Sequence, residues 1–210
     1  MKRIVKEPDI RRAEIILAAK ELFETQGYTN TPVESIIRKV NIAKGTFYYY
    51  FKSKNEILKA LVENTGEEME ELFNSIIDVK HLSALEKLKL IFRGPKKTEI
   101  TKSSVMQVIH KPENRELQEQ LNIQAVEVIA PLIAKVFEQG YVEGIFKNKV
   151  SVEIIQIMVA GSQFVLDSGL FEWSSQQRKT FLKSMQILLE QLTGVKPGRF
   201  SFIANEGGNS

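Results

Sequence analysis

TPVESIIRKVNIAKGTFYYYFKSK, residues 31–54, decides the fold of this chain. Apolar residues recur at helical spacing over residues 33–40, and a second short helical pattern follows over residues 43–50. Asn41 stands between the two patterns, where the chain must turn, and asparagine tolerates a positive φ better than most residues. The stretch therefore predicts two short helices joined by a tight turn.

Capping residues mark where helices of this region are expected to begin. Thr31 is a good N-cap for the first short helix, and Glu34 completes a capping box with it. Ser53 and Glu56 form a second capping box, after which apolar residues continue at helical spacing to about residue 77. The length of this last helix suggests a connection between two domains.

The second short helix has two faces that differ in kind. Phe47 and Phe51, four residues apart, fall on one face and are expected to close the core. On the other face, Lys44 can offer its charge to a phosphate or a guanine, and Gly45 lets the backbone approach another surface closely. Threonine and tyrosine hydroxyls can bond phosphate oxygens or base edges. The residues expected to contact DNA are Thr31, Lys44, Gly45, Thr46, Tyr48, Tyr49, Lys52 and Lys54.

Positive charge is concentrated in the first quarter of the chain. Residues 1–54 hold 11 Lys/Arg and 6 Asp/Glu, a net charge of +5, whereas the remaining residues hold 18 and 20, a net charge of −2. This division indicates a polyanionic partner at the N-terminal end, although a solvated basic face is the alternative. Taken singly, the tyrosines also fit ordinary half-buried aromatics and Gly45 a helix irregularity. Their combination on one short helix favours DNA binding.

Composition and motifs argue against other classes of protein. The absence of cysteine excludes disulfides and thiolate metal sites, and it suits a cytoplasmic protein. No run of about 18 apolar residues is present, so we expect neither a transmembrane helix nor a membrane partner. The two histidines, His81 and His110, lack paired metal spacing, and the nucleophile-elbow, dinucleotide-binding and P-loop motifs are missing. We therefore expect no catalytic residue, no metal site, no cofactor and no enzymatic activity.

Two runs of sequence carry a resemblance to a known family. RRAEIILAAKELFETQGY at residues 11–28, followed by TPVESIIRKVNIAKGTFYYYFKSKNEIL at residues 31–58, resembles the N-terminal domain of the tetracycline-repressor (TetR/AcrR) family. Three places depart from the usual pattern: Ile37, the Val40-Asn41 pair and Ala43. Ala43 replaces the serine that usually caps the recognition helix, a loss of about 1 kcal/mol and of one phosphate contact.

The resemblance implies an all-α protein with two domains and a tail. An N-terminal three-helix helix-turn-helix DNA-binding domain, residues 1–54, would be joined by a long helix to a helical effector-binding and dimerisation domain, residues 55–194. Residues 195–210 are expected to form a flexible tail. The implied function is that of a cytoplasmic transcriptional regulator, a ligand-responsive repressor that binds a palindromic double-stranded DNA operator as a homodimer.

The second domain supplies the expected dimer interface and effector pocket. Two helices over residues 151–167 and 174–192 correspond to those that pair between subunits in the family, and the second has a wide apolar stripe that includes Phe181, Met185, Leu188 and Leu192. By the same resemblance, a small apolar or amphipathic effector would lie against Met106, Gln107, His110, Gln163 and Phe164. A core or surface histidine is the simpler interpretation of His110. Pro131 should kink the long helix that contains it.

Two rival functions from other classes stay open on the sequence alone. One is a non-specific nucleoid or architectural DNA-binding protein, which would bind random and genomic DNA alike. The other is a helical small-molecule carrier or enzyme, which would require a polar constellation that the sequence does not show.

Overall fold

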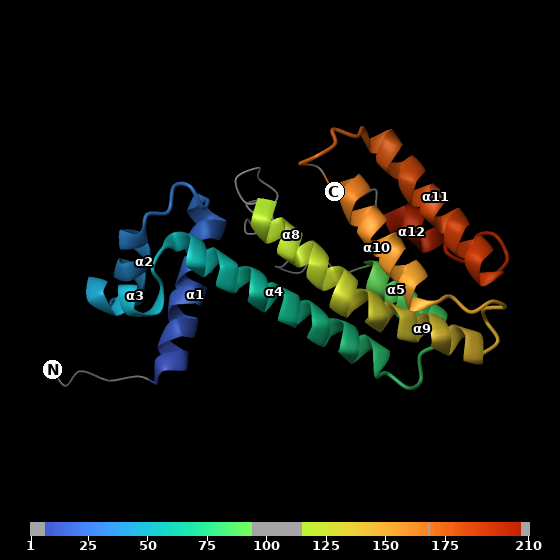
Figure 1. The fold of residues 1–210 in the computed structure, drawn as a ribbon, viewed down its shortest axis with the longest axis horizontal. Helices are drawn as coiled ribbons and strands as arrows, with labels where there is room; N and C mark the ends of the chain where they lie inside the picture. Colours follow the sequence, from blue (N-terminus) through green and yellow to red (C-terminus); the bar gives the residue numbers. More distant parts are fainter. Residues whose placement is uncertain (1–6, 94–114, 168, 207–210) are drawn as a thin grey trace. The chain divides into compact units, whose positions relative to one another are not determined.

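The computed structural model describes residues 7–93, 115–167 and 169–206 (Figure 1). In these ranges every regular element is a helix, which confirms the all-α prediction. The elements are α1 (Pro8–Gln26), α2 (Val33–Val40), α3 (Lys44–Tyr50), α4 (Lys54–Ile77), α5 (Ala84–Arg93), α8 (Arg115–Gln124), the π-helical segment η2 (Ala125–Ile129), α9 (Ala130–Val142), α10 (Val152–Leu166), α11 (Ser175–Thr193) and α12 (Ser201–Glu206).

Contacts divide the chain into two compact units, and the division falls within α4, after Gly66. This point lies further along α4 than the boundary predicted at residue 54. The first half of α4 thus packs with the helix-turn-helix, and the second half packs with the C-terminal helices. We call the two parts the N-terminal unit (described residues 7–66 and 115–117) and the C-terminal unit (described residues 67–93, 118–167 and 169–206).

The N-terminal unit is built around a small aromatic and aliphatic core. Phe23 of α1, Ile36 of α2 and Phe47 of α3 are all completely buried, and Leu58 of α4 joins them. Burial of each such side chain contributes about 1.5–3 kcal/mol, so α2 and α3, each too short to be stable alone, are held by packing. The turn between them has Asn41 at φ 55° and ψ 52°, as the sequence predicted.

The helix starts of this unit differ in part from the capping predictions. α2 begins at Val33, and no side chain caps it. Thr31 is instead completely buried, and its hydroxyl donates to the carbonyl oxygens of Gly27 (2.8 Å) and Leu22 (3.3 Å). The predicted capping box between Thr31 and Glu34 is therefore wrong, because the turn after α1 takes the threonine hydroxyl.

The predicted capping box at the start of α4 is present in altered form. The Ser53 hydroxyl accepts the Glu56 N–H (3.2 Å), while the Glu56 carboxylate accepts the N–H of Lys52 (2.7 Å). The carboxylate thus reaches one residue further back than in the standard box. The hydrogen bonds hold the link between α3 and α4 in place.

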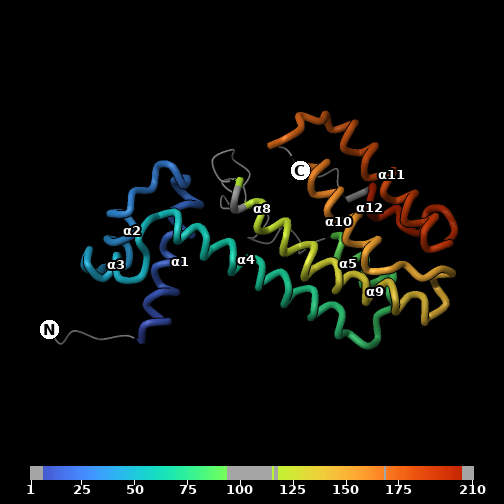
Figure 2. Tube along the Cα trace, in the orientation of Figure 1, coloured from blue at the N-terminus to red at the C-terminus, as the bar shows by residue number. Residues whose placement is uncertain are grey.

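The core of the C-terminal unit includes the segment that follows α11. Phe200 is completely buried, its ring stacks with those of Phe137 and Phe146, and Ile203 is buried beside it. α12 packs against α5 and α11 (Figure 2). The flexible tail predicted for residues 195–210 is therefore wrong over residues 195–206, because aromatic burial outweighs the cost of ordering a short segment.

A buried carboxylate fixes the same segment. Glu190 of α11 accepts the backbone N–H groups of Gly198 (2.8 Å) and Phe200 (3.1 Å) and the side-chain amide of Gln186 (2.8 Å). Burial alone would raise the pKa of Glu190, but these hydrogen bonds outweigh that effect and hold the pKa below its ordinary value. The ionised carboxylate thus ties residues 198–200 to α11.

A π-helical turn directly precedes Pro131 in its helix. In η2 the N–H of Ala130 bonds to the carbonyl of Ala125, five residues back. In an α-helix that N–H would bond to the carbonyl of Val126, which instead accepts the side-chain amide of Gln156 on α10 (3.2 Å). The sequence predicted a kink at Pro131, and the structure has a widened turn directly before it, in which the carbonyl of Val126 is satisfied from a neighbouring helix.

By length and composition, Gln118–Val142 is apolar enough to cross a membrane. In the structure its second half is a core helix, because Ala130, Ile133, Val136 and Phe137 of α9 are buried in the C-terminal unit. Core helices of soluble proteins share this composition.

Replacing Glu190 with glutamine should reduce stability in a pH-dependent way. At pH 7 we expect the free energy of unfolding to fall by about 1–3 kcal/mol, because hydrogen bonds to a charged acceptor are weakened. The difference in unfolding free energy between the variant and wild type should shrink as pH falls. The decrease begins below the pKa of an ordinary glutamate and is complete below the lower pKa of folded Glu190, because the wild-type carboxyl is then protonated too. Urea unfolding, followed by Trp173 fluorescence at several pH values, measures this difference in the free energy of unfolding. Glu67→Gln, on the exposed surface of α4, is the control.

Candidate nucleic-acid interface and ligand cavity

One face of α3 is anchored and the other is open to solvent. Phe47 and Phe51 are buried, and their rings contact each other at 6.4 Å between centroids. Tyr49 is 73% exposed, and Tyr48 and Lys44 are also exposed. The predicted division of this helix into a core face and an outward polar face is therefore present in the structure.

Lys44 lies at the start of α3 with only weak attachments. Its ammonium is 3.7 Å from the Glu34 carboxylate of α2 and 5.9 Å from the centre of the Tyr48 ring. Both members of the ion pair are largely exposed, and such pairs contribute about 0–1 kcal/mol. A phosphate or a base edge can therefore take the place of Glu34 at little cost.

The N-terminal end of α3 has room for a close approach from outside. Ala43 provides no side-chain cap, as expected. A Cβ atom added to Gly45 would meet no atom within 4 Å, and Gly45 itself is exposed. Packing inside the protein therefore does not require a glycine here. Thr46, next along the helix, is half-buried.

Lys52 and Lys54, which follow α3, differ in exposure and in their hydrogen-bond partners. Lys52 is exposed, and its ammonium donates to the carbonyl of Tyr48 (2.9 Å) near the C-terminal end of α3. Lys54 is turned inward: its ammonium donates to the carbonyl of Tyr28 (2.5 Å) and lies 4.2 Å from the centre of the Tyr28 ring. Burial lowers the pKa of Lys54. In this structure Lys54 ties the start of α4 to the turn after α1.

The predicted DNA contact by Thr31 is wrong. Its side chain has no exposed surface, and its hydroxyl is bonded within the unit. Six others share the α3 region and reach solvent to differing degrees: Lys44, Gly45, Thr46, Tyr48, Tyr49 and Lys52.

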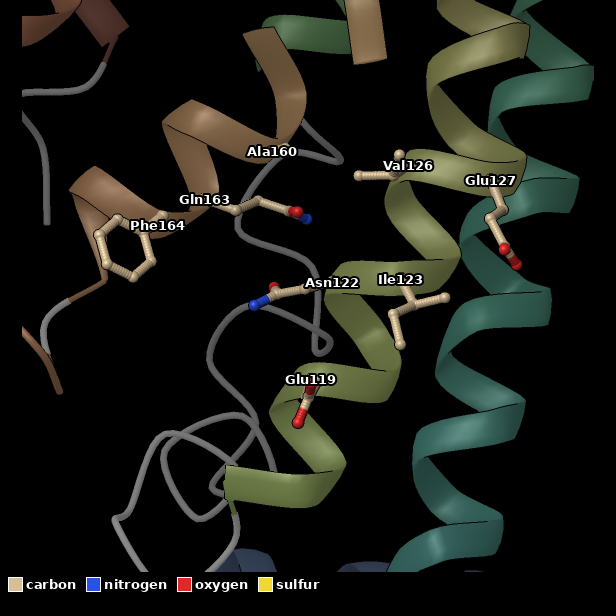
Figure 3. Close-up of a pocket in the computed structure, with 8 residues that line it drawn as sticks. All are labelled: Glu119, Asn122, Ile123, Val126, Glu127, Ala160, Gln163 and Phe164. Carbon is tan, nitrogen blue, oxygen red and sulfur yellow. The ribbon is translucent and has the colours of Figure 1, made fainter. Parts of the chain in front are cut away.

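A cavity of about 390 Å³ opens in the C-terminal unit beside α8, η2 and α10 (Figure 3). Its lining residues are Glu119, Asn122, Ile123, Val126, Glu127, Ala160, Gln163 and Phe164. The structure thus places two of the predicted pocket residues, Gln163 and Phe164, at one cavity. The other three, Met106, Gln107 and His110, lie outside the described residues.

Most of the cavity wall was missed from the sequence. Glu119, Ile123 and Val126 recur at helical spacing on one side of the helix before Pro131, and that spacing was a usable signal. Because the helix widens at η2, residues 126 and 127 both reach the cavity.

α10 and α11 carry apolar residues that the chain itself does not cover. Ile157 is 72% exposed, and Leu188 and Phe181 are also exposed. Met185 and Leu192, which were predicted to be in the same interface, instead pack against the core of their own unit. Large exposed apolar residues gathered on two helices are typical of an association surface.

Comparisons with known proteins assign the chain to a family. Residues 15–61 match the family described as bacterial regulatory proteins, tetR family, and residues 96–186 match the tetracyclin repressor-like C-terminal domain. The chain belongs to the tetracycline-repressor family. Its members are DNA-binding transcriptional regulators, and this chain is accordingly a DNA-binding transcriptional regulator.

Individual relatives of this family cover most of the chain. The fatty acid metabolism regulator protein of Bacillus subtilis is 26% identical over 174 residues, 79% of this chain and 84% of its own. The transcriptional repressor KstR2 of Mycolicibacterium smegmatis is 23% identical over 163 residues, 76% of this chain and 78% of its own. The crystal structure of FadR from Bacillus subtilis with stearoyl-CoA shares the fold, at a TM-score of 0.56 and 20% identity, over 92% of this chain and 98% of its own.

Gly45→Ala should separate stability from DNA binding. We expect the N-terminal unit to gain up to about 1 kcal/mol, because alanine favours a helix over glycine and the added methyl group meets open space. We expect affinity for a DNA sequence selected by the wild-type protein to fall by about 1–3 kcal/mol, the usual size of one lost interface contact. Thermal unfolding and fluorescence anisotropy measure the two effects. Unchanged DNA affinity would contradict a close approach at Gly45.

Proposed function

We propose that each subunit reads its operator with the outward face of α3. Lys44, Gly45, Tyr48 and Tyr49 would lie in a major groove, and Thr46 would bond the backbone or a base edge. The observation that carries this proposal is the contrast within one short helix, in which Phe47 is completely buried while Tyr49 is 73% exposed. The core thereby orients a set of polar and aromatic groups towards solvent.

The register on the DNA backbone would be set at the link between α3 and α4. Lys52 is exposed there, and the N-terminal end of the α4 helix dipole carries partial positive charge. Lys54 would act indirectly, because its ammonium holds Tyr28 and so fixes where α4 begins. This assignment replaces the direct phosphate contact that the sequence suggested for Lys54.

Two subunits would associate through the exposed apolar residues of α10 and α11. Ile157, Phe181 and Leu188 would form the surface, and Met185 and Leu192 would support it from beneath. Family members bind operators as dimers, and a two-fold dimer would recognise a palindromic operator whose half-sites lie about one helical turn or a little more apart.

A small amphipathic effector in the cavity lined by Gln163 and Phe164 would lower operator affinity. α4 runs continuously through the division between the two units, so a change in the C-terminal unit can reach the helix-turn-helix through it. Coupling of this kind amounts to about 1–3 kcal/mol. The protein would act in the bacterial cytoplasm as a regulator, without enzymatic activity and without a membrane partner.

A non-specific DNA-binding protein is the rival function, and the salt dependence of binding distinguishes the two. A specific regulator keeps a large preference for its selected sequence over random DNA, whereas a non-specific protein binds both alike and loses both with added salt.

Leu188→Asp should yield monomers and weaken operator binding together. A carboxylate in an apolar interface must be desolvated without a partner, so we expect a dimer to dissociate in sedimentation analysis. Because each half-site is then bound independently, affinity for the palindrome should fall by a factor of about 100 or more. The matched control is Val142→Asp, which places the same charge at an exposed apolar residue of a different helix, α9. A stable Leu188→Asp dimer would overturn the interface assignment.

A further inference from the structure

The cavity beside α8, η2 and α10 is lined by both apolar and polar side chains. Ile123, Val126, Ala160 and Phe164 supply the apolar surface. In Figure 3 the side chains of Asn122 and Gln163 extend from facing helices into the space between them. A ligand that fits here therefore needs an apolar body and one polar group.

Gln163 presents a buried hydrogen-bond acceptor to the cavity. Its side-chain oxygen is buried and has no hydrogen-bond partner among the described residues. A buried acceptor without a donor is costly, and a ligand that supplies an N–H or O–H group removes that cost. The amide oxygen of Gln163 accordingly favours a hydrogen-bond donor over a ligand that can only accept.

The charges of the wall exclude one class of polar group. Glu119 and Glu127 both line the cavity, and no lysine or arginine does so among the residues that the structure describes. Two carboxylates at the cavity wall repel an anion and attract a cation, and solvent moderates the effect because both residues are exposed. A carboxylate or phosphate group on the ligand is therefore disfavoured.

We propose that this cavity binds a small amphiphile whose polar group donates hydrogen bonds and carries no negative charge, such as an alcohol or an ammonium compound. The proposal rests on the ligand-responsive function proposed above and gives the chemical class of the effector. Gln163 is the acceptor for the polar group, Phe164 and Ile123 contact the apolar body, and the two glutamates select against anions.

The chain contains a built-in reporter for the test. Trp173 is its single tryptophan, and its ring stacks on Phe171 at 5.2 Å between centroids. Phe171 in turn contacts the ring of Phe164, a cavity residue, at 5.5 Å. Occupation of the cavity that moves Phe164 should therefore change Trp173 fluorescence.

Three probes with similar alkyl chains separate the chemical classes: octanol, octylammonium and octanoate. Fluorescence titration of the full chain should show saturable binding of octanol and octylammonium, with octanoate weaker by about tenfold or more. Gln163→Leu, which keeps the bulk of the side chain but removes its acceptor, should weaken octanol binding by about tenfold. The double variant Glu119→Gln, Glu127→Gln should bring the affinities of octylammonium and octanoate together, whereas Glu153→Gln, elsewhere on α10, should not.

Several outcomes would overturn the proposal. These are binding of octanoate as tight as that of octanol, unchanged octanol binding by Gln163→Leu, and no saturable binding of any probe. DNA binding by the same wild-type preparation, measured without probes, tests the proposed repressor separately. Normal sequence-specific DNA binding together with any of these ligand results would refute the ligand class alone.

Discussion

Burial of the Phe47 ring is the interaction on which the DNA-binding surface depends. α3 has about two turns, too few to hold a helical conformation by its own hydrogen bonds. Phe47 is completely buried and contacts the rings of Tyr48 and Phe51. Removal of such a ring from a core costs about 3–5 kcal/mol, a large part of the stability of a small unit. The orientation of Lys44 and Tyr49 towards solvent follows from this one anchor.

In the C-terminal unit, several buried polar groups are satisfied by neighbouring elements. The Glu190 carboxylate accepts the N–H groups of the chain before α12, and Gln156 donates to the carbonyl that η2 leaves free. Lys87, although buried, donates to the carbonyl of Ile77 and to Gln139. Gln163 differs from all of these, because its buried oxygen has no partner among the described residues. Its position at the cavity makes this exception the feature that best indicates a ligand.

Local sequence patterns predicted the N-terminal unit well, because its turn and core depend on residues close together in the chain. Asn41 adopts the left-handed conformation that its side chain allows, and Phe47 and Phe51 are buried as their spacing implied. Thr31 shows the limit of such patterns. A threonine before a helix can cap it or bond to the preceding turn, and only the position of α1 decides between the two.

The features that the sequence did not predict depend on contacts between residues distant in the chain. The apolar stripe of α11 is wider than one interface needs, so spacing could not show that Met185 packs inward while Leu188 stays exposed. Pro131 was expected to kink its helix, but the turn before it is π-helical, and the carbonyl that this turn leaves free is bonded by Gln156, which is distant in sequence. The docking of Phe200 likewise depends on rings contributed by α9 and the residues after it.

The most direct measurement of the central claim is selection of DNA from a random double-stranded library by the purified protein. The account predicts that the selected sequences share a palindrome whose half-sites lie about one helical turn or a little more apart. It also predicts that Lys44→Ala relaxes the preference at particular base pairs, whereas Lys39→Ala, which removes a lysine paired with Glu21, does not. Selected sequences without a shared motif, or a base preference unchanged by Lys44→Ala, would contradict reading of DNA by the outward face of α3.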